Sequence, residues 1–122
     1  MKALVWSRLG APCRLCRHLG ASHNHVTSAC GGPRCRCKTF TLKNEDLARI
    51  AKAALREGLR YVGVRGARIQ TMEVKGTMLV RAAVVTGAWA SLGHQQRQDL
   101  CHRLVEEWVG RDEQRVLVET WT

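Results

Sequence analysis

The stretch 44-NEDLARIAKAALREG-58 begins the part of the chain with a regular apolar pattern. Its apolar residues recur every three or four positions, which places them on one face of a helix. Asn44 can cap the amino end, since its side chain can accept a hydrogen bond from a free N–H of the first turn. Glycine is typical at the end of a helix, so we predict that this helix ends at Gly58. The stripe consists of Leu47, Ile50, Ala51, Ala54 and Leu55.

Two strands are predicted to follow this helix. Residues 59–74 are rich in β-branched side chains and have no helical period, and Lys75-Gly76 supplies a turn after them. The next segment, 77-TMLVRAAVV-85, has apolar groups at both odd and even positions. Such a pattern indicates a strand that is mostly buried on both faces.

A second helix is predicted from Ser91 to Val109, with Gly110 as its carboxyl-terminal stop. Residues 114–122 then alternate between two faces, as a half-buried strand does. The resulting order, α-β-β-α-β, predicts a two-layer α+β domain with both helices on one face of a three-stranded sheet. The apolar stripe of this helix consists of Leu100, Cys101, Leu104, Val105 and Trp108, and a polar stripe consists of His94, Gln98 and His102.

Basic residues are concentrated near the amino end of the chain. The formal net charge is +10, but residues 44–122 carry 12 Lys or Arg and 10 Asp or Glu. Residues 1–43 carry eight Lys or Arg and no acidic residue. We therefore predict that residues 44–122 form the folded domain and that residues 1–43 form a leader.

The leader has the composition of a mitochondrial transit peptide. It is rich in arginine, contains serine and lacks acids, which is typical of such peptides. A positive segment is drawn inward by a membrane potential that is negative inside. It has no apolar run of about 18 residues, so no membrane span is expected. We predict localisation in the mitochondrial matrix, with a disordered basic arm as the alternative role of residues 1–43.

Five of the six cysteines lie between residues 13 and 37. Cys13 and Cys16 have the C-x-x-C spacing that lets two thiolates reach one tetrahedral ion. The later cysteines do not repeat that spacing, so we predict no metal, and a zinc site formed by Cys13, Cys16, Cys30 and Cys35 is the alternative. The sixth cysteine, Cys101, falls on an apolar helical stripe and is predicted to be a buried small hydrophobe.

The stretch 84-VVTGAWASLGHQQRQDLC-101 resembles the BolA family. In that family a strand ending in valines runs into an aromatic residue, a short loop and a helix that begins with Arg-His-Arg-Leu-Val. Here residues 84–86 match the strand end and Trp89 takes the aromatic position. Arg97 follows at the family spacing, and Leu100-Cys101 lies where the Leu-Val pair lies. With the order of elements, the resemblance covers about residues 44–122.

The resemblance implies a KH-like fold and a non-catalytic role in iron–sulfur cluster delivery with a monothiol glutaredoxin. It also implies a ligand histidine at the start of the last strand, where this chain has Gln114 or Arg115. The loop at Lys75-Gly76 offers no second Cys or His. We therefore predict that no cofactor is required and that a shared [2Fe–2S] cluster forms poorly. The predicted partner face consists of Gln114, Arg115, Arg97 and Trp89.

A different class of function is suggested by Gly63-Val64-Arg65-Gly66. This is the G-x-x-G pattern with which KH domains clamp nucleotides, although here it precedes a predicted strand, where a turn or bulge is the structural alternative. Arg60 and Arg68 lie close by in sequence and would suit phosphate groups. The alternative function is therefore an RNA-binding or structural component of a mitochondrial ribosome or ribonucleoprotein, contacting RNA through Gly63, Arg65, Gly66 and Arg68.

Motifs typical of enzymes are missing from the sequence. Residues 44–122 contain one Cys and two His, without a nucleophile–base spacing. There is no P-loop, dinucleotide fingerprint or Gly-x-Ser-x-Gly motif. We predict a binding or adaptor protein rather than an enzyme.

Overall fold

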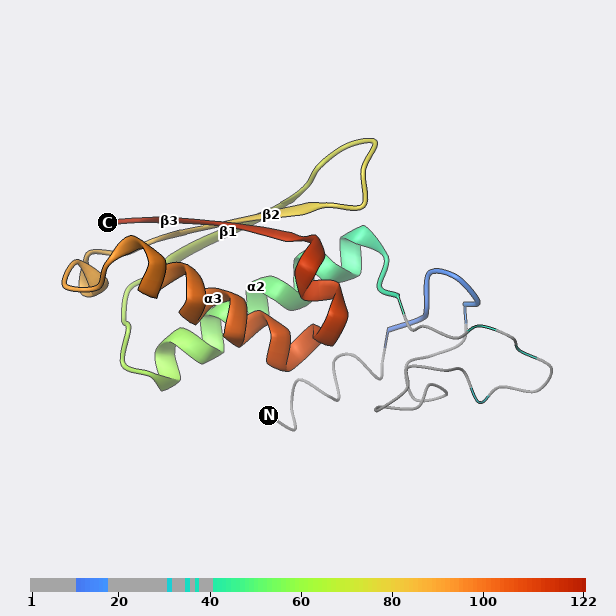
Figure 1. Cartoon of the computed structure of the whole chain (residues 1–122), viewed down its shortest axis with the longest axis horizontal. Coiled ribbons are helices and arrows are strands. Elements are labelled where there is room, and N and C mark those ends of the chain that lie inside the picture. Colours follow the sequence, from blue (N-terminus) through green and yellow to red (C-terminus); the bar gives the residue numbers. More distant parts are fainter. Residues whose placement is uncertain (1–10, 18–30, 32–34, 36, 38–40) are drawn as a thin grey trace.

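The computed structural model describes residues 11–17, 31, 35, 37 and 41–122. Two helices and three strands alternate with two 3-10 segments (Figure 1). This order confirms the predicted α-β-β-α-β arrangement. The elements are α2 (Asn44–Tyr61), β1 (Arg68–Glu73), β2 (Val80–Val85), η2 (Gly87–Trp89), α3 (His94–Val109), η3 (Gly110–Arg115) and β3 (Val116–Trp121).

The three strands form a mixed sheet in the order β1-β2-β3. Strands β1 and β2 are antiparallel and joined by a short loop, whereas β2 and β3 are parallel. A parallel pair needs a crossover connection, and α3 supplies it. Both helices lie on the same side of the sheet (Figure 1), so the protein has the α+β class that the sequence predicts.

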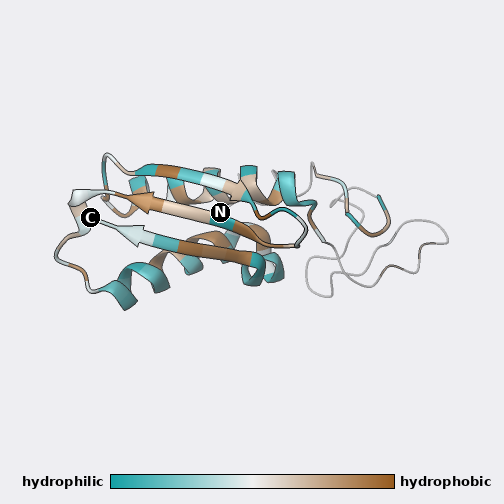
Figure 2. Ribbon diagram, turned by 90° about the horizontal axis from the view of Figure 1, so that it is seen from above, coloured by the Kyte–Doolittle hydropathy of each residue, from teal (hydrophilic) through white to brown (hydrophobic). Residues whose placement is uncertain are grey.

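The sheet has one buried and one exposed face. In β2 and β3 alternate residues are buried, and the residues between them are more exposed. Seen from above, the sheet lies over the two helices (Figure 2). The expectation that 77–85 is buried on both faces is therefore wrong, because no described element covers the second face. The buried set is Val80, Ala82, Val84, Val116, Val118 and Thr120, and the exposed set includes Arg81, Val85, Leu117 and Trp121.

Helix α2 does not end at Gly58 but continues to Tyr61. A Cβ atom at Gly58 would lie 2.6 Å from Cδ2 of Leu104 on α3. Gly58 therefore serves the close approach of the two helices rather than the end of α2. The chain turns away at Gly63, which has φ +88°, a conformation that glycine adopts without strain.

Asn44 does not cap α2, contrary to the prediction. Lys43 is the residue before the first turn, and it provides no side-chain hydrogen bond. The Asn44 side chain instead donates to the Thr77 carbonyl at 2.8 Å and accepts from Arg115 at 2.8 Å. The Asn44 side chain is therefore engaged by residues far away in sequence and does not accept a hydrogen bond from the first turn of α2.

The described part of the leader contacts the domain. Ala11 and Cys13 are buried in the core, and Cys13 pairs with Leu42 in a single antiparallel bridge. The Leu42 N–H donates to Asp112 at 3.0 Å. The boundary near residue 43 stays a prediction, and removing residues 1–43 would remove these contacts.

Across the described ranges, no helix combines the length and apolar character needed to cross a membrane.

Candidate functional site

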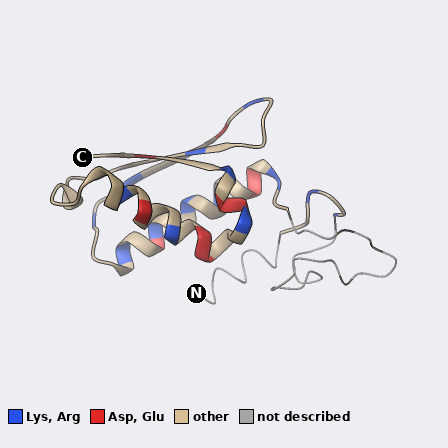
Figure 3. Cartoon of the chain, viewed as in Figure 1, with Lys and Arg blue, Asp and Glu red and all other residues tan. Residues whose placement is uncertain are grey.

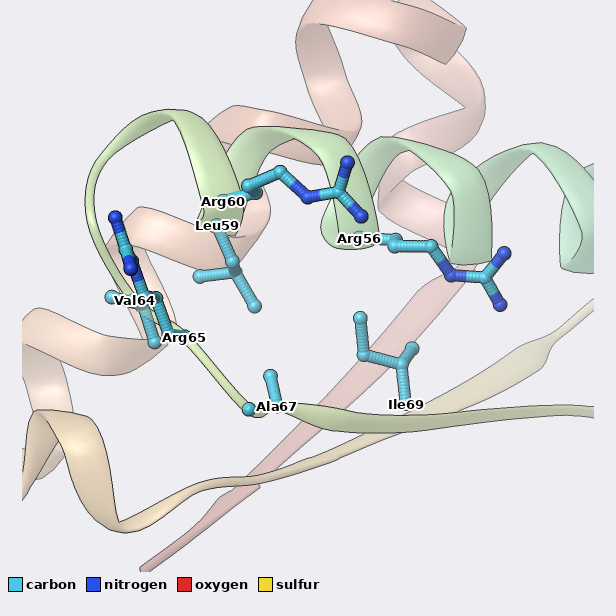
Figure 4. Close-up of a pocket in the computed structure, with 8 residues that line it drawn as sticks. Arg56, Leu59, Arg60, Val64, Arg65, Ala67 and Ile69 are labelled. Atoms are coloured by element: carbon cyan, nitrogen blue, oxygen red, sulfur yellow. The ribbon is translucent and has the colours of Figure 1, made fainter.

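A pocket of about 400 Å³ lies where α2 gives way to β1. Its floor is apolar, since Leu59 and Ile69 are buried there, and three arginines stand around it (Figure 4). The pocket therefore combines positive charge with an apolar surface. Its lining consists of Arg56, Leu59, Arg60, Val64, Arg65, Gly66, Ala67 and Ile69.

Helical geometry brings two of the arginines together. Arg56 and Arg60 are four residues apart on α2, so they lie on the same face one turn from each other. Basic residues are also favoured at this end of a helix, because the macrodipole is negative there. Arg65 lines the same pocket from the loop that follows α2, and its guanidinium points away from those of Arg56 and Arg60 (Figure 4).

The loop is held at two points. The Val64 N–H donates to the Leu59 carbonyl at 2.8 Å, and the Thr86 hydroxyl donates to the Arg65 carbonyl at 3.1 Å. Gly63 and Gly66 have φ values of +88° and +70°, and no atom lies within 4 Å of a Cβ built on either. The two glycines are thus required by backbone conformation, and the G-x-x-G segment connects a helix to a strand.

The three pocket arginines have no ion-pair partner within the described ranges. None of them takes part in a salt bridge or side-chain hydrogen bond there, and no acidic residue lines the pocket. By contrast, Arg49, Arg81 and Arg115 pair with carboxylates. Both helices carry basic and acidic positions (Figure 3). Three guanidiniums that lack acceptors favour an anionic ligand.

The predicted RNA contact stays a prediction, and its four residues do not all lie at this pocket. Arg65 and Gly66 line the pocket, whereas Gly63 and Arg68 do not. Arg68 is exposed and begins β1, where its neighbour Ile69 faces the core, so alternation directs Arg68 to the other face of the sheet. Sequence reasoning missed Arg56, which the four-residue spacing to Arg60 could have indicated.

The four residues of the predicted partner face do not gather at one place. Arg97 lines a pocket with Trp121, at the carboxyl end of β3, whereas Gln114 is exposed just before the start of that strand. A six-residue strand separates its first and last residues by about 17 Å. Trp89 is buried and donates its indole N–H to the Trp121 carbonyl at 3.0 Å, so its side chain belongs to the core.

Arg115 also has a structural environment. Its guanidinium donates to the carbonyls of Met78 and Leu42, to the Asp112 carboxylate and to the Asn44 side chain, each at 2.8 Å. Only 13% of its side chain is exposed. The Arg115 guanidinium therefore has its donors engaged within the domain. Of the two positions where the BolA resemblance implies a ligand histidine, only Gln114 is exposed.

Three cysteines of the amino-terminal segment come together. The Sγ atoms of Cys13, Cys16 and Cys37 all lie within 4.8 Å of one another. Of the alternative zinc set, Cys35 is not part of this group and Cys30 lies outside the described residues. These three thiols are the candidate metal ligands.

The remaining cysteine and one histidine are held within the domain. Burial raises the pKa of the Cys101 thiol to about 12, and Cys101 is fully buried, as predicted for a small hydrophobe. Nδ1 of His102 pairs with the Glu113 carboxylate. The absence of enzymatic activity stays a prediction.

Comparison with protein-family models, curated proteins and solved structures finds no match to this chain. The resemblance to the BolA family therefore rests on residues 84–101 and on the order of elements. The chemistry of the pocket is the firmest basis for inferring a function.

Proposed function

We propose that the protein is a non-catalytic RNA-binding protein that holds phosphate groups of the RNA backbone between Arg56, Arg60 and Arg65. The observation that carries this proposal is the set of three guanidiniums without a carboxylate partner in the described chain. A guanidinium binds phosphate oxygens through two parallel N–H donors, so arginine suits this ligand.

An extended polyanion fits better than an isolated phosphate. Lys52 lies one helical turn before Arg56 on the same side of α2 and lines a neighbouring pocket against β1. From Lys52 to Arg60 the helix rises about 12 Å, which is longer than one phosphate group. The row of cations therefore matches successive charges of a nucleic-acid strand.

A single-stranded region of RNA is the form that we expect to bind. Tyr61 ends α2, lines a second pocket that also contains Arg103, and 92% of its surface is exposed. Exposed aromatic rings beside basic residues stack on unpaired bases, which is how proteins commonly read single-stranded RNA. Tyr61→Ala should therefore weaken binding without changing its salt dependence.

The direct test is fluorescence anisotropy of the full chain with a labelled single-stranded RNA oligonucleotide. The variant Arg56→Gln/Arg60→Gln/Arg65→Gln should bind at least tenfold more weakly. Its slope of log affinity against log salt should be shallower by about 2, since each phosphate contact with a single strand contributes roughly 0.7.

A matched control removes the same charge elsewhere. Lys43, Lys75 and Arg111 are exposed and do not line the pocket. Replacing these three by Gln should leave most of the affinity intact. Equal losses in both triple variants would mean that the RNA responds to net charge alone, and the pocket would not be its site.

A second candidate is the BolA-like mitochondrial adaptor that acts with a monothiol glutaredoxin. It is supported by the resemblance of residues 84–101, by the order of elements and by the exposure of Gln114, two residues before the start of β3. Gln114→His should strengthen retention of a shared [2Fe–2S] cluster in the presence of glutaredoxin and glutathione. Arg115→His should not do so, because it dismantles the contacts of the buried guanidinium.

A pull-down from mitochondria separates the two functions. Recovery of RNA and ribosomal proteins that depends on the pocket arginines would support RNA binding. Recovery of a monothiol glutaredoxin that is insensitive to those arginines would support the adaptor and contradict the first proposal.

A further inference from the structure

The three clustered cysteines have the spacing of ligands to one metal ion. The Sγ atoms of Cys13 and Cys37 are 4.0 Å apart, and the whole group lies within 4.8 Å. In a tetrahedral zinc–thiolate site with Zn–S bonds of about 2.3 Å, two sulfur atoms are about 3.8 Å apart. The observed spacing therefore needs only a small contraction to surround a single ion.

Distant parts of the chain contribute these ligands. Cys13 and Cys16 lie on one turn, where the Arg17 N–H donates to the Cys13 carbonyl at 2.8 Å. Cys37 comes 24 residues after Cys13. Such a C-x-x-C turn facing a later cysteine is the arrangement by which structural zinc sites join two segments.

Backbone hydrogen bonds hold Cys13 in position. The Thr41 N–H donates to the Cys13 sulfur at 3.4 Å, and the Arg14 N–H donates to the Thr41 carbonyl at 2.6 Å. The Cys13 sulfur is therefore placed by the fold at the point where it meets the sulfur of Cys37.

We propose that Cys13, Cys16 and Cys37 bind one Zn²⁺ ion, which ties residues 11–17 to Cys37, a residue that packs against the core of the domain. Soft thiolate ligands at tetrahedral spacing favour Zn²⁺ over hard cations such as Mg²⁺ or Ca²⁺. A tetrahedral ion takes a fourth ligand besides these three. The site is independent of RNA binding, since no cysteine lines the arginine pocket.

The zinc site excludes cleavage near residue 43 in the same molecule. All three ligands precede that residue, so a chain cut there would have neither the ligands nor the buried Ala11 and Cys13. The mature amino terminus of the protein isolated from cells therefore tests the proposal directly. An intact mass that includes residues 13–37 is expected, and a chain starting near residue 43 would overturn it.

Metal content is the second test. The full chain, expressed with added zinc and purified under reducing conditions, should contain one zinc per chain by plasma mass spectrometry. Cys13→Ser/Cys16→Ser and Cys37→Ser should each lower that content at least tenfold, whereas the control Cys101→Ala should retain it. Cobalt in place of zinc should give the tetrahedral ligand-field bands and a thiolate charge-transfer band.

Wild-type zinc content makes the proposal falsifiable even if a cysteine variant fails to fold. Zinc at the level of contamination in the reduced wild-type chain would overturn it, and so would a Cys13–Cys37 disulfide found by intact mass under the same conditions. A third readout is trypsin cleavage after Arg14. Chelation of the zinc should accelerate this cleavage in the wild type and leave the cysteine variants unchanged, whereas an unchanged wild-type rate would contradict the tie to the core.

Discussion

The two ends of helix α2 use arginine in opposite ways. At the amino end, Arg115 is only 13% exposed and donates to four groups, including the Asp112 carboxylate. At the carboxyl end, Arg56, Arg60 and Arg65 are exposed and have no acceptor in the described chain. A buried charge must be fully paired to be tolerated, whereas exposed guanidiniums remain solvated and available. The difference separates an arginine that holds the fold from arginines that can hold a ligand.

Removing the paired arginine should produce the largest loss of stability. Arg115→Met removes the charged partner of the buried Asp112 carboxylate, which then keeps only the Leu42 N–H, and it removes a donor to the Leu42 carbonyl. We expect the free energy of unfolding in urea to fall by about 3 kcal/mol, as when one partner of a buried ion pair is removed. Arg115→Lys should recover only part of the loss, because an ammonium cannot reproduce the planar fork.

The control for this variant is Arg111→Met, which removes an exposed arginine close by in the chain. It should change stability by less than about 0.5 kcal/mol. Equal effects of the two substitutions would show that the contacts of Arg115 contribute no more than surface charge, and the contrast between the two ends of α2 would be lost.

Between the two ends, Gly58 sets the distance from α2 to α3. An exposed Gly→Ala change within a helix stabilises by about 1 kcal/mol. Here the new methyl group would lie 2.6 Å from Cδ2 of Leu104, so we expect Gly58→Ala to destabilise by about 2 kcal/mol through overpacking. Urea unfolding measures the change.

A double-mutant cycle isolates the cause of this effect. If the clash with Leu104 is responsible, Gly58→Ala should lower the free energy of unfolding much less in a Leu104→Ala background than in the wild type. Additive effects would mean that the two side chains do not compete for space. In that case Gly58 would be required for some reason other than the helix contact.

The smallest effect on stability is expected at the carboxyl end of α2. Arg56→Gln/Arg60→Gln/Arg65→Gln removes no salt bridge or side-chain hydrogen bond within the described chain, so the free energy of unfolding should change by no more than about 0.5 kcal/mol. The same variant is the one expected to bind RNA at least tenfold more weakly. A large loss of stability would place these arginines with Arg115 as parts of the fold and undermine the proposed site.

The sequence by itself determined the elements and the faces of most of them. The stripe from Leu47 to Leu55 is buried as its period predicts, and the alternation of Val116, Val118 and Thr120 identifies the inner face of β3. Gly110 follows α3 as expected and has φ +61°. These features are local, since each depends on a helical or strand period that can be read along a few residues.

Only the tertiary structure decided which residues meet across the fold. Gly58 is a point of close packing because Leu104 approaches from α3, and Asn44 is not a cap because Arg115 and Thr77 engage its side chain. Likewise, Cys37 joins Cys13 and Cys16 although its spacing in sequence did not single it out.

The arginines illustrate the same limit. Arg56 joins the pocket because it is one turn from Arg60, and Arg68 is directed to the other face by the alternation of β1. In sequence, Arg68 is closer to the glycine loop than Arg56 is, so sequence distance alone would place Arg68 in the pocket and leave Arg56 out. Sequence periods define the direction of a side chain relative to its own element, but the packing of elements against one another determines its neighbours, and that packing depends on contacts between residues far apart in the chain.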